Sequence, residues 1–274
     1  MTDLETREDP GPRVARFHAS GTGVGRVPYP ILITRATVLR RELVTEHMLR
    51  ISVGGPDVAD FHSYQFDDHV RIVFAWPDGT RTDPVPNDRQ MLDWPHPFPP
   101  SRKYTVRRFD RGLGEIDLDV VLHDGGVASE WAREVAVGDE VVLAGPPGAK
   151  VFAQTYDHYV MVVDPTGLPA LARWLEESPA DVSANVLIDV DHAAESAYPL
   201  AAREAVRVQW LDRSAGSRLA EAVAALDLTG RGRTFLFAAG EAGDIRPLRA
   251  WAKDSGTDAL VTGYWKRGLA DLDE

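Results

Sequence analysis

Residues 102–107 form a short strand-like segment with the sequence Arg-Lys-Tyr-Thr-Val-Arg. A flavin site needs a cation for the pyrophosphate, a flat ring against the isoalloxazine and a hydroxyl near its polar edge. Arg102, Tyr104 and Thr105 supply these three groups. Alternation along a strand places Arg102, Tyr104 and Val106 on one face and the other three residues on the opposite face. The same pattern also describes an exposed basic strand with one aromatic residue.

A second segment, residues 123–131, has the sequence His-Asp-Gly-Gly-Val-Ala-Ser-Glu-Trp. A glycine-rich turn after a strand opens a helix here, and the free amides and positive dipole end of a helix start form a natural phosphate site. In the alternative interpretation Ser129 only caps the helix and Trp131 belongs to the core. This second segment follows the first by about 20 residues, which favours the interpretation that the two segments form one binding site.

Cysteine is absent from the sequence. This excludes disulfides, dithiol chemistry, thiolate nucleophiles, all-cysteine iron-sulfur clusters and cysteine-based zinc sites. The eight histidines show neither an HExxH pattern nor a short two-histidine spacing, so no intrinsic metal site is expected. Redox chemistry in this chain would need a bound organic cofactor.

The net charge excludes some partners. Lys and Arg total 30 against 42 Asp and Glu, a formal net charge of -12. Nucleic acid and anionic membranes would be repelled, so neither is an expected partner. No apolar stretch approaches the roughly 20 residues of a membrane span, and residues 1–13 are too polar for a signal peptide. A cytoplasmic location is the expectation.

The first half of the chain reads as short strands separated by turn residues. Several of them alternate with a period of two, which is typical of an antiparallel barrel or sandwich. The strands are expected at residues 31–38, 48–53, 69–76, 103–109, 115–122 and 139–145, with a helix at 128–135.

The second half alternates apolar strand-like runs with helical segments, a pattern that predicts a parallel sheet flanked by helices. The runs are 158–164, 184–190, 206–211, 234–240 and 258–265, and the helical segments 168–177, 217–226 and 245–253. The change of pattern falls near the Gly/Pro segment 145–150. We therefore expect a mobile N-terminal arm (1–28), an antiparallel β-barrel (29–150) and an α/β domain with a parallel sheet of the nucleotide-binding type (151–274).

Six separated segments, in order, resemble motifs of the siderophore-interacting proteins. RKYTVR is similar to the RxYTxR flavin motif of that family, and HDGGVASEWA to its H-G-x-x-G-P-A-S-x-W-A segment. The other matches are residues 68–71 (D-x-H-V-K-L strand), 138–148 (G-D-x-v-x-x-x-G-P-x-G), 239–249 (A-G-E-x-x-x-x-R-x-x-R) and the terminal 263–268. The likeness covers about residues 30–268.

This resemblance implies a barrel that binds FAD. Carried over residue by residue, it assigns the flavin to Arg102, Tyr104 and Thr105, and the FAD phosphates and ribityl chain to His123, Gly126, Ala128 and Ser129. His69 and Trp131 are weaker FAD candidates, because a strand histidine and a helix tryptophan often serve packing alone. Val127 replaces the usual proline of the motif, which should loosen the turn without removing an amide donor.

Nicotinamide binding rests on a less regular match. The family typically shows G-D-E-T-A-L-P-A where residues 163–170 read Val-Asp-Pro-Thr-Gly-Leu-Pro-Ala, and Pro165 removes an amide. The resemblance implies NAD(P) contacts by Asp164, Thr166, Gly240 and Glu241. Two further acids that follow a predicted strand, at positions 189 and 191, would disfavour a 2'-phosphate unless they are simply solvated.

The activity that the resemblance implies is that of an FAD-dependent ferric-siderophore reductase. NADH or NADPH would reduce the FAD, and electrons would then pass to Fe(III) held in a siderophore or another iron chelate. No protein metal ligand and no catalytic acid or base is assigned. Lys266 and Arg267, in the terminal motif, would lie near the rim of the chelate site, with two solvated surface charges as the alternative.

Three rival functions remain open. In the first, ferredoxin or another donor reduces the flavin. In the second, the protein only binds a siderophore, without reductase activity. In the third, it is a flavin reductase of specialised metabolism. The sequence identifies neither the chelate, nor the preferred nicotinamide, nor the oligomeric state.

Overall fold

The computed structural model describes residues 7–269 and divides into two compact units. The barrel unit comprises the chain up to Arg16 and Gly25–Val151, and the sheet unit comprises Phe17–Val24 and the chain from Phe152 onward. Each unit has its own core and is described by itself below.

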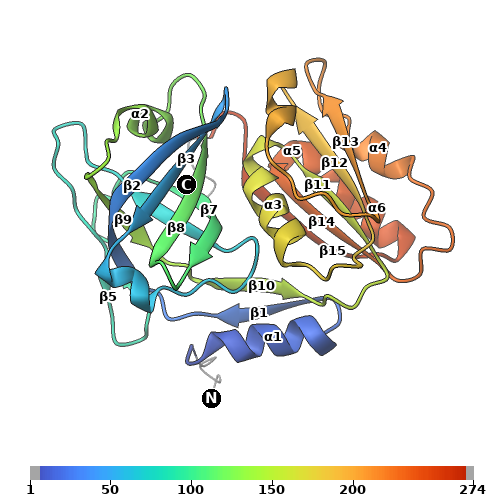
Figure 1. The fold of residues 1–274 in the computed structure, drawn as a ribbon, viewed down its shortest axis with the longest axis horizontal. Helices are drawn as coiled ribbons and strands as arrows, with labels where there is room; N and C mark the ends of the chain where they lie inside the picture. The colour runs from blue at the N-terminus through green and yellow to red at the C-terminus, as the bar shows by residue number, and fades with distance from the viewer. Residues whose placement is uncertain (1–6, 270–274) are drawn as a thin grey trace. The chain divides into compact units, whose positions relative to one another are not determined.

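The barrel unit is built on six antiparallel strands that close on themselves in the order β2-β3-β8-β7-β4-β9 (Figure 1). The strands are β2 (Ile33–Thr45), β3 (Met48–Gly54), β4 (His69–Val73), β7 (Ser101–Asp110), β8 (Glu115–Val121) and β9 (Glu140–Ala144). All six coincide with strands that the sequence predicts, and the helix predicted beside them is α2 (Val127–Glu134). The predicted antiparallel barrel is therefore confirmed.

Alternation of apolar residues explains why these strands curl into a barrel. Residues of one face of each strand, such as Ile51 and Val53 of β3 and Val70 and Ile72 of β4, are fully buried in one core. Helix α2 adds small residues to that core, including Ala132. Burying apolar area of this kind contributes about 25 cal/mol per Å². The barrel core thus also holds α2 against the strands.

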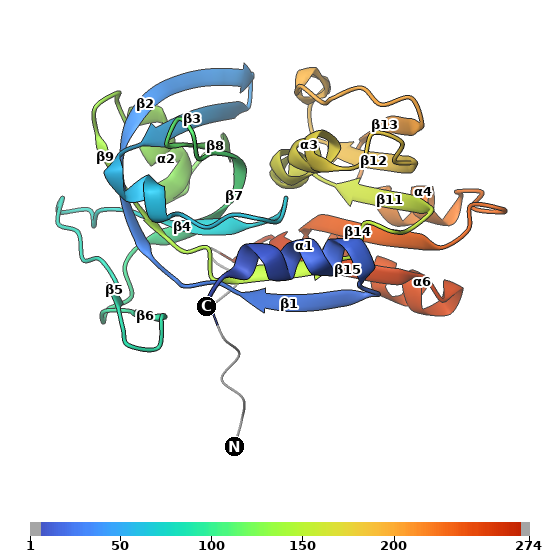
Figure 2. The same cartoon turned by 60° about the horizontal axis from the view of Figure 1, so that its bottom comes forward.

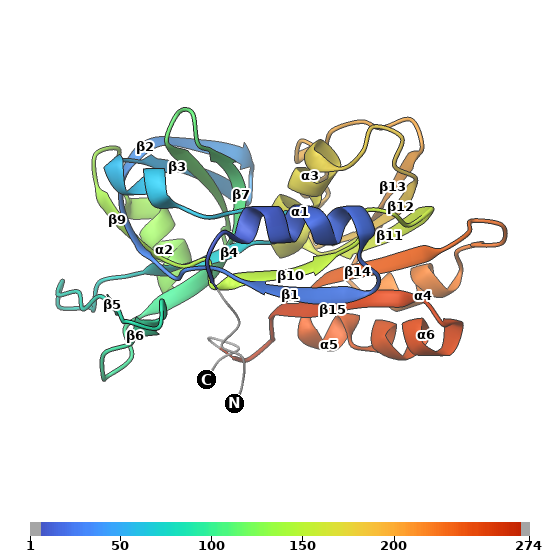
Figure 3. The same cartoon turned by 90° about the horizontal axis from the view of Figure 1, so that it is seen from below.

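The sheet unit contains five parallel strands in the order β13-β12-β11-β14-β15. They are β11 (His158–Val163), β12 (Ala184–Val190), β13 (Val206–Asp212), β14 (Thr234–Glu241) and β15 (Asp258–Trp265). Helix α3 (Leu168–Glu177) covers one face, and α4 (Leu219–Ala224), α5 (Ala242–Ile245) and α6 (Pro247–Ser255) cover the other (Figure 3). The predicted α/β architecture is confirmed.

Near-continuous apolar strands are the reason that helices cover both faces. Every residue of β11 is buried, and so are all but the first residue of β14. On the α4–α6 face, Val160, Val162 and Leu236 pack with Leu219 and Leu248. Strands buried on both sides are the mark of a parallel sheet between helical layers.

The N-terminal segment departs from the prediction. Residues 10–28, expected within a mobile arm, form helix α1 (Pro10–Ser20) and strand β1 (Val24–Pro28), which pairs with β10 (Gly148–Phe152) (Figure 2). Val14 and Val27 are buried, so this short segment has apolar anchors. Their spacing is too sparse to stand out from a sequence rich in charge, Gly and Pro. Residues 1–6 of the expected arm lie outside the described residues.

A few short elements complete the fold. Two-residue strands β5 (Val85–Pro86) and β6 (Leu92–Asp93) pair with each other in the Pro-rich loop of the barrel unit. Single 3-10 turns lie at η1 (Pro56–Asp60), η2 (Pro165–Gly167) and η3 (Ala193–Ala197). Of these, η2 directly follows the central strand β11 and lies at the edge of the sheet that carries most of the polar residues described next.

Candidate functional site

Strand β7 contains the first predicted segment, residues 102–107, with Tyr104 and Val106 on the face toward the barrel core, as the period-two pattern predicts. Tyr104 pairs with Val70 and Thr105 with His69 across the β4–β7 ladder. Val106 is fully buried in the barrel core, and Tyr104 packs partly against that core. Burial raises the pKa of the Tyr104 hydroxyl, although nearby Arg102 opposes the shift. The hydroxyl therefore stays protonated at neutral pH and can donate a hydrogen bond.

Arg102 is a half-buried cation at the start of this strand. Its guanidinium donates to the Ser101 carbonyl at 2.7 Å. Within residues 7–269 it has no carboxylate partner, unlike Arg108 on the same strand, which is paired with Asp117 at 2.7 Å. A cation without a carboxylate partner beside a phenol ring suits a phosphate-bearing aromatic ligand.

The second predicted segment forms a turn held by a buried serine. Ser129 is fully buried, and its Oγ accepts from the His123 amide at 3.2 Å and donates to the Val121 carbonyl at 3.3 Å. Gly126 is the N-cap of α2, and no side chain caps the helix. The first-turn amides, including that of Ala128, thus have no side-chain acceptor, which is the property a phosphate site needs.

Two observations favour glycine at position 126, the second being a close approach to the exposed His123 ring, which would have to shift for a larger residue. The φ of Gly126 is +96°, in the region that favours glycine. A Cβ at Gly126 would lie 3.0 Å from Cε1 of His123. The imidazole of His123 therefore lies against the backbone at the helix start, where its Nδ1 is 3.2 Å from the Asp124 carbonyl oxygen.

The two weaker FAD candidates have clear structural surroundings. The Trp131 ring centroid is 5.4 Å from that of Phe74, and Trp131 packs against the barrel core. His69 is half-buried and pairs through its backbone with Thr105. Packing accounts for Trp131 without a ligand, and contact of either residue with FAD stays a prediction.

One carboxyl group near β4 was missed at the sequence level. Burial and the neighbouring carboxylate of Asp68 raise the pKa of Asp67 to about 7. Asp68 itself is buried and accepts from the amides of Tyr64 at 2.7 Å and Gln65 at 2.9 Å. Asp68 belongs to the matched segment 68–71, but Asp67 gave no signal in the sequence, because only the loop geometry shows which of the two acids takes the amide donors.

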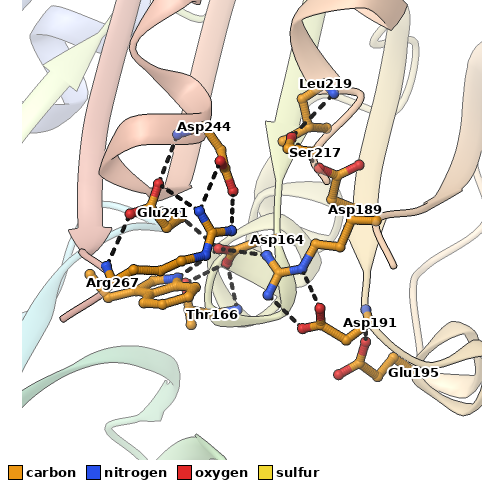
Figure 4. Close-up of polar contacts among 12 residues, drawn as sticks. Asp164, Thr166, Asp189, Asp191, Glu195, Ser217, Leu219, Glu241, Asp244 and Arg267 are labelled. Carbon is orange, nitrogen blue, oxygen red and sulfur yellow. Dashed lines mark hydrogen bonds and ion pairs between the residues drawn. The ribbon is translucent and has the colours of Figure 1, made fainter. Parts of the chain in front are cut away.

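In the sheet unit, polar side chains from the ends of all five strands meet at one edge (Figure 4). This edge is the carboxyl end of a parallel sheet, the place where α/β sheets bind their ligands. The contributing residues are Asp164 and Thr166 after β11, Asp189 and Asp191 at β12, Arg213 after β13, Glu241 and Asp244 at β14, and Trp265 and Arg267 at β15. We call this set the edge cluster.

Asp164 is the centre of the edge cluster. Its Oδ1 accepts from the Thr166 amide at 2.9 Å and hydroxyl at 2.6 Å. Its Oδ2 accepts from the Glu241 amide at 2.9 Å and from Nε1 of Trp265 at 2.7 Å. A Cβ at Gly240 would lie 2.7 Å from the Asp164 carboxyl carbon, so only glycine permits this approach. The four predicted NAD(P) residues thus lie together, but mainly bond one another.

Pro165 causes less disruption than the motif comparison suggests. It occupies the first position of η2, where a helical turn has no internal acceptor for an amide. Asp164 caps that turn by accepting from Thr166. Gly167 is needed on steric grounds, since a Cβ there would lie 2.8 Å from Cβ of Val163. The turn after β11 is therefore well formed despite its departures from the motif.

Two arginines pair with the carboxylates of the edge cluster, and only one of them, Arg267, was a predicted site residue. Arg213 was not a candidate; it pairs with Asp191 at 2.8 Å and lies 3.5 Å from Asp164. Burial opposes its charge, but the hydrogen bond to Asp191 and the charges of Asp164 and Asp191 raise the pKa of Arg213. Arg267 pairs with Asp244 at 2.6 Å and lies 3.6 Å from Glu241.

Trp265 lies between these two cations. Its ring centroid is 5.8 Å from the guanidinium carbon of Arg213 and 5.6 Å from that of Arg267, distances typical of cation–π contact. Together with its bond to Asp164, these contacts hold the indole at the strand ends. The terminal GYWKRG motif hinted at this residue, but its partners come from distant parts of the sequence.

The family of the chain follows from its similarity to known proteins. Residues 37–150 match the family model of the siderophore-interacting FAD-binding domain, and residues 156–268 match that of the siderophore-interacting protein. A relative from Escherichia coli, the NADPH-dependent ferric-chelate reductase, is 34% identical over 203 residues, 72% of this chain and 79% of the relative. The chain belongs to the siderophore-interacting protein family.

Other members support the same placement. The ferric vibriobactin reductase ViuB of Vibrio cholerae is 27% identical over 88% of this chain and 90% of its own. A siderophore utilization protein from T. fusca is 34% identical with a TM-score of 0.85, covering 91% of this chain and 98% of the other. A ferredoxin NADP+ reductase from Neisseria gonorrhoeae, at 13% identity and a TM-score of 0.59, shares the fold.

The two predicted chelate-binding residues, Lys266 and Arg267, differ in whether their charge is paired. Lys266 and Arg267 are both exposed, as the rim position requires. Arg267 is neutralised by Asp244 and Glu241, whereas Lys266 has no carboxylate partner in the described part of the chain. Over residues 7–269, no group of three or more His, Asp or Glu could hold a metal ion, and every helix is too short or too polar to span a bilayer.

Proposed function

We propose that this protein is an FAD-dependent ferric-siderophore reductase that takes electrons from a reduced nicotinamide. The observation that carries the proposal is the match of both units to siderophore-interacting domains, with a relative above 30% identity that is named a ferric-chelate reductase. The polar face of β7 and the uncapped start of α2 supply the groups an FAD would need.

Four features of the barrel unit could each bind part of an FAD molecule. Arg102 has no carboxylate partner in the part of the chain that the structure describes, which suits it to the pyrophosphate. Tyr104 offers a ring and a protonated hydroxyl, and Thr105 a hydroxyl on the opposite face of the strand. The α2 start offers amides for a phosphate, and Ser129 holds that turn in place. His123, Gly126 and Ala128 would line the same phosphate position, with His69 and Trp131 nearby.

Bound FAD would supply the conversion from a two-electron hydride donor to single electrons for Fe(III). The chain itself would orient the two reactants and exclude water, since none of its residues needs to move a proton to the iron. Reduction promotes release because Fe(II) matches hard oxygen donors less well than Fe(III) does. The described residues offer no metal-ligand cluster, which suits iron that arrives and leaves as a substrate in its chelate.

The edge cluster is the proposed nicotinamide site. Asp164, Thr166, Gly240 and Glu241 would shape the site by holding the strand ends and Trp265, because their polar atoms already bond within the protein. Direct contact with the dinucleotide would fall to more exposed members of the cluster. Asp191 has a side chain 48% exposed, so it is such a member.

The test is anaerobic stopped-flow mixing of the FAD-loaded protein with NADH or NADPH, followed by a panel of ferric siderophores. The proposal expects the flavin absorbance to bleach with at least one nicotinamide and to return with at least one chelate, with Fe(II) trapped by a ferrous-specific chelator. Protein that takes up no FAD, or reduced protein that no ferric chelate reoxidises, would exclude the assignment.

A second candidate donor is ferredoxin or another reductase. The observation in its favour is that the predicted nicotinamide contacts already bond within the protein. Asp164 accepts from Thr166 and from the Glu241 amide. The Glu241 carboxylate accepts from the amides of Asp244 and Arg267. In that case reduced ferredoxin would bleach the flavin faster than either nicotinamide at equal concentration. Faster bleaching by a nicotinamide would exclude this candidate.

A further inference from the structure

The edge cluster lies where the order of the parallel strands reverses. Sequence-adjacent strands run outward from β11 to β12 and β13, and the chain then returns to β14 on the other side. Ligands of open α/β sheets bind at this reversal, outside the carboxyl ends of the strands. The charge of the strand ends therefore decides which dinucleotide the edge accepts.

Acidic groups dominate that edge. Five carboxylates gather there against two guanidinium groups. The carboxylates are those of Asp164, Asp189, Asp191, Glu241 and Asp244 (Figure 4). The guanidinium groups are those of Arg213 and Arg267. A phosphate monoester brings a charge of about -1.5 to -2 at neutral pH. It would meet like charge at this edge unless a free cation compensated it.

Both cations of the edge cluster are already compensated. Arg213 is held between Asp191 and Asp164, and its side chain is only 8% exposed. Arg267 is held by Asp244 and Glu241. A phosphate that recruited either one would have to displace a charge-assisted pair. Breaking the buried pair of Arg213 with Asp164 is strongly unfavourable, whereas Arg267, with a side chain 56% exposed, is held less firmly. Neither guanidinium group of the edge cluster is thus free to bind a 2'-phosphate, and the adjacent Lys266 is the exposed cation that such a group could still reach.

One carboxylate oxygen of the edge cluster has no hydrogen-bond donor among the described residues. Asp189 is fully buried; its Oδ2 accepts from Ser217, while its Oδ1 has no hydrogen-bond partner. Asp189 lies at the end of β12, the second strand of this sheet along the chain. Dinucleotide-binding folds often carry an acid about 20 residues after their first strand–helix turn, where it accepts from the adenosine ribose. Because Oδ1 of Asp189 is shielded from solvent, a ribose hydroxyl would donate to it only after the side chains around it moved, and an ionised phosphate has no proton to donate.

We propose that the electron donor of this protein is NADH, with a free adenosine 2'-hydroxyl, and that Asp189 and Asp191 select against the 2'-phosphate of NADPH. This inference rests on the proposed nicotinamide-dependent function. It sets the chain apart from its relative in Escherichia coli, whose name says that it depends on NADPH.

The binding test needs neither FAD nor catalysis. Calorimetric titration of the full chain with ADP-ribose and with 2'-phospho-ADP-ribose gives the ratio of the two affinities. We expect at least about tenfold tighter binding of ADP-ribose, the ratio produced by a difference of about 1.4 kcal/mol. Equal affinities, or tighter binding of the phosphorylated ligand, would overturn the inference.

Asp191→Asn tests Asp191 with little risk to the fold, because its side chain is 48% exposed. The change removes one negative charge and leaves Arg213 with Asp164 as its carboxylate partner in the edge cluster. The ligand ratio and the NADH to NADPH ratio of flavin-reduction rates should each fall about 3- to 10-fold, through a gain for the phosphorylated member. Asp254→Asn, an exposed residue of α6, makes the same change in net charge and should leave both ratios unchanged. Equal effects in the two variants would overturn the assignment to Asp191.

The double variant Asp191→Asn with Arg213→Gln tests the role of Arg213. It restores the net charge of the edge cluster, and the gain for the phosphorylated ligand should disappear again. Persistence of that gain would mean that Arg213 is not the group responsible for it, which would overturn this part of the inference.

Failure of the inference can be told apart from failure of the reductase assignment. If neither nicotinamide form binds, the donor inference falls, while dithionite-reduced protein that a ferric chelate reoxidises still supports the reductase. If dithionite-reduced protein transfers nothing to any chelate, the reductase assignment falls, and the two ADP-ribose affinities still decide the nucleotide preference.

Discussion

Single residues of the same type have different surroundings in this protein. Arg102 and Arg108 lie on the same strand, yet Arg108 pairs with Asp117 while Arg102 has no carboxylate partner among residues 7–269. Asp67 and Asp68 are neighbours, yet only Asp68 collects the amide donors of Tyr64 and Gln65. These differences decide which charges remain available to a ligand.

The charge of Arg102 should therefore show directly in FAD affinity. Arg102→Ala together with Thr105→Ala should weaken FAD binding by about 2–4 kcal/mol, because a charged and a neutral hydrogen bond are lost. The measurement is fluorescence titration of the apoprotein with FAD. Lys103→Ala removes a positive charge from the adjacent, exposed position and serves as the control. An equal loss in both proteins would argue for general electrostatics over a specific contact.

Asp67 should make the stability of the barrel unit depend on pH. Its pKa of about 7 lies above the ordinary value, since burial and Asp68 disfavour its charged form. The folded state binds this proton more tightly than the unfolded chain does, so the group's contribution to stability is lost as pH rises from about 4 to about 7.

Asp67→Asn removes that dependence. The variant should gain about 1–2 kcal/mol more in free energy of unfolding at pH 8 than at pH 5, a value reduced for the partial exposure of the side chain. Urea denaturation at the two pH values measures the gain, and exposed Asp88→Asn is the control. A gain that is the same at both pH values would mean that the Asp67 carboxyl titrates normally.

At the scale of elements, turns between a strand and a helix carry the site. The sequence predicted six barrel strands, five sheet strands and helices α2 and α3 close to their observed places, because period-two alternation and buried apolar runs are local signals. It missed α1 and β1, whose few apolar anchors are buried by partners distant in sequence. The start of α2 shows what such a local signal cannot supply, namely the contact of Gly126 with His123.

Two adjacent glycines allow a matched test of that turn. Gly125 and Gly126 both have positive φ, +71° and +96°, but only at Gly126 would a Cβ meet a neighbour, His123. Gly126→Ala should lower stability by about 1–2 kcal/mol and weaken FAD binding at least about fivefold by moving the helix start.

Gly125→Ala carries the backbone strain alone. It should lower stability by about 1 kcal/mol and leave FAD affinity within about twofold of the wild type. Thermal denaturation and FAD titration of both variants measure the two effects. An equal loss of FAD affinity would mean that strain at the turn, and not the position of His123, controls the phosphate site.

At the scale of the whole molecule, net charge sets how substrates arrive. A formal charge of -12 repels anionic ferric chelates, so any exposed cation without a partner near their site has a large relative effect. We propose Lys266 as such a cation, since it has no carboxylate partner in the described chain, whereas Arg267 is neutralised by Asp244 and Glu241. The structure thus separates two residues that the sequence treated as a pair.

The two residues should differ in kinetics. Lys266→Ala should raise the apparent KM for anionic ferric chelates about 2- to 5-fold at low salt and less at high salt, because screening weakens steering by exposed charges. Arg267→Ala should change it less, since its charge is already compensated. The rate of flavin reoxidation at several ionic strengths measures both. Equal KM values for Lys266→Ala and the wild type at every salt concentration would remove Lys266 from the site.

The sequence by itself determined the fold class, the strand and helix order and the family, because periodicity and ordered motifs are properties of neighbouring residues. It also pointed to Asp164, Thr166, Gly240 and Glu241 as one group. Only the tertiary structure decided what that group does: Nε1 of Trp265 reaches Asp164 across 101 positions of the chain. Arg213 gave no signal at all, because its role depends on partners at the ends of other strands. Parallel strands bring their carboxyl ends to one edge, and the pairing of charges there depends on distances in space that no local pattern records.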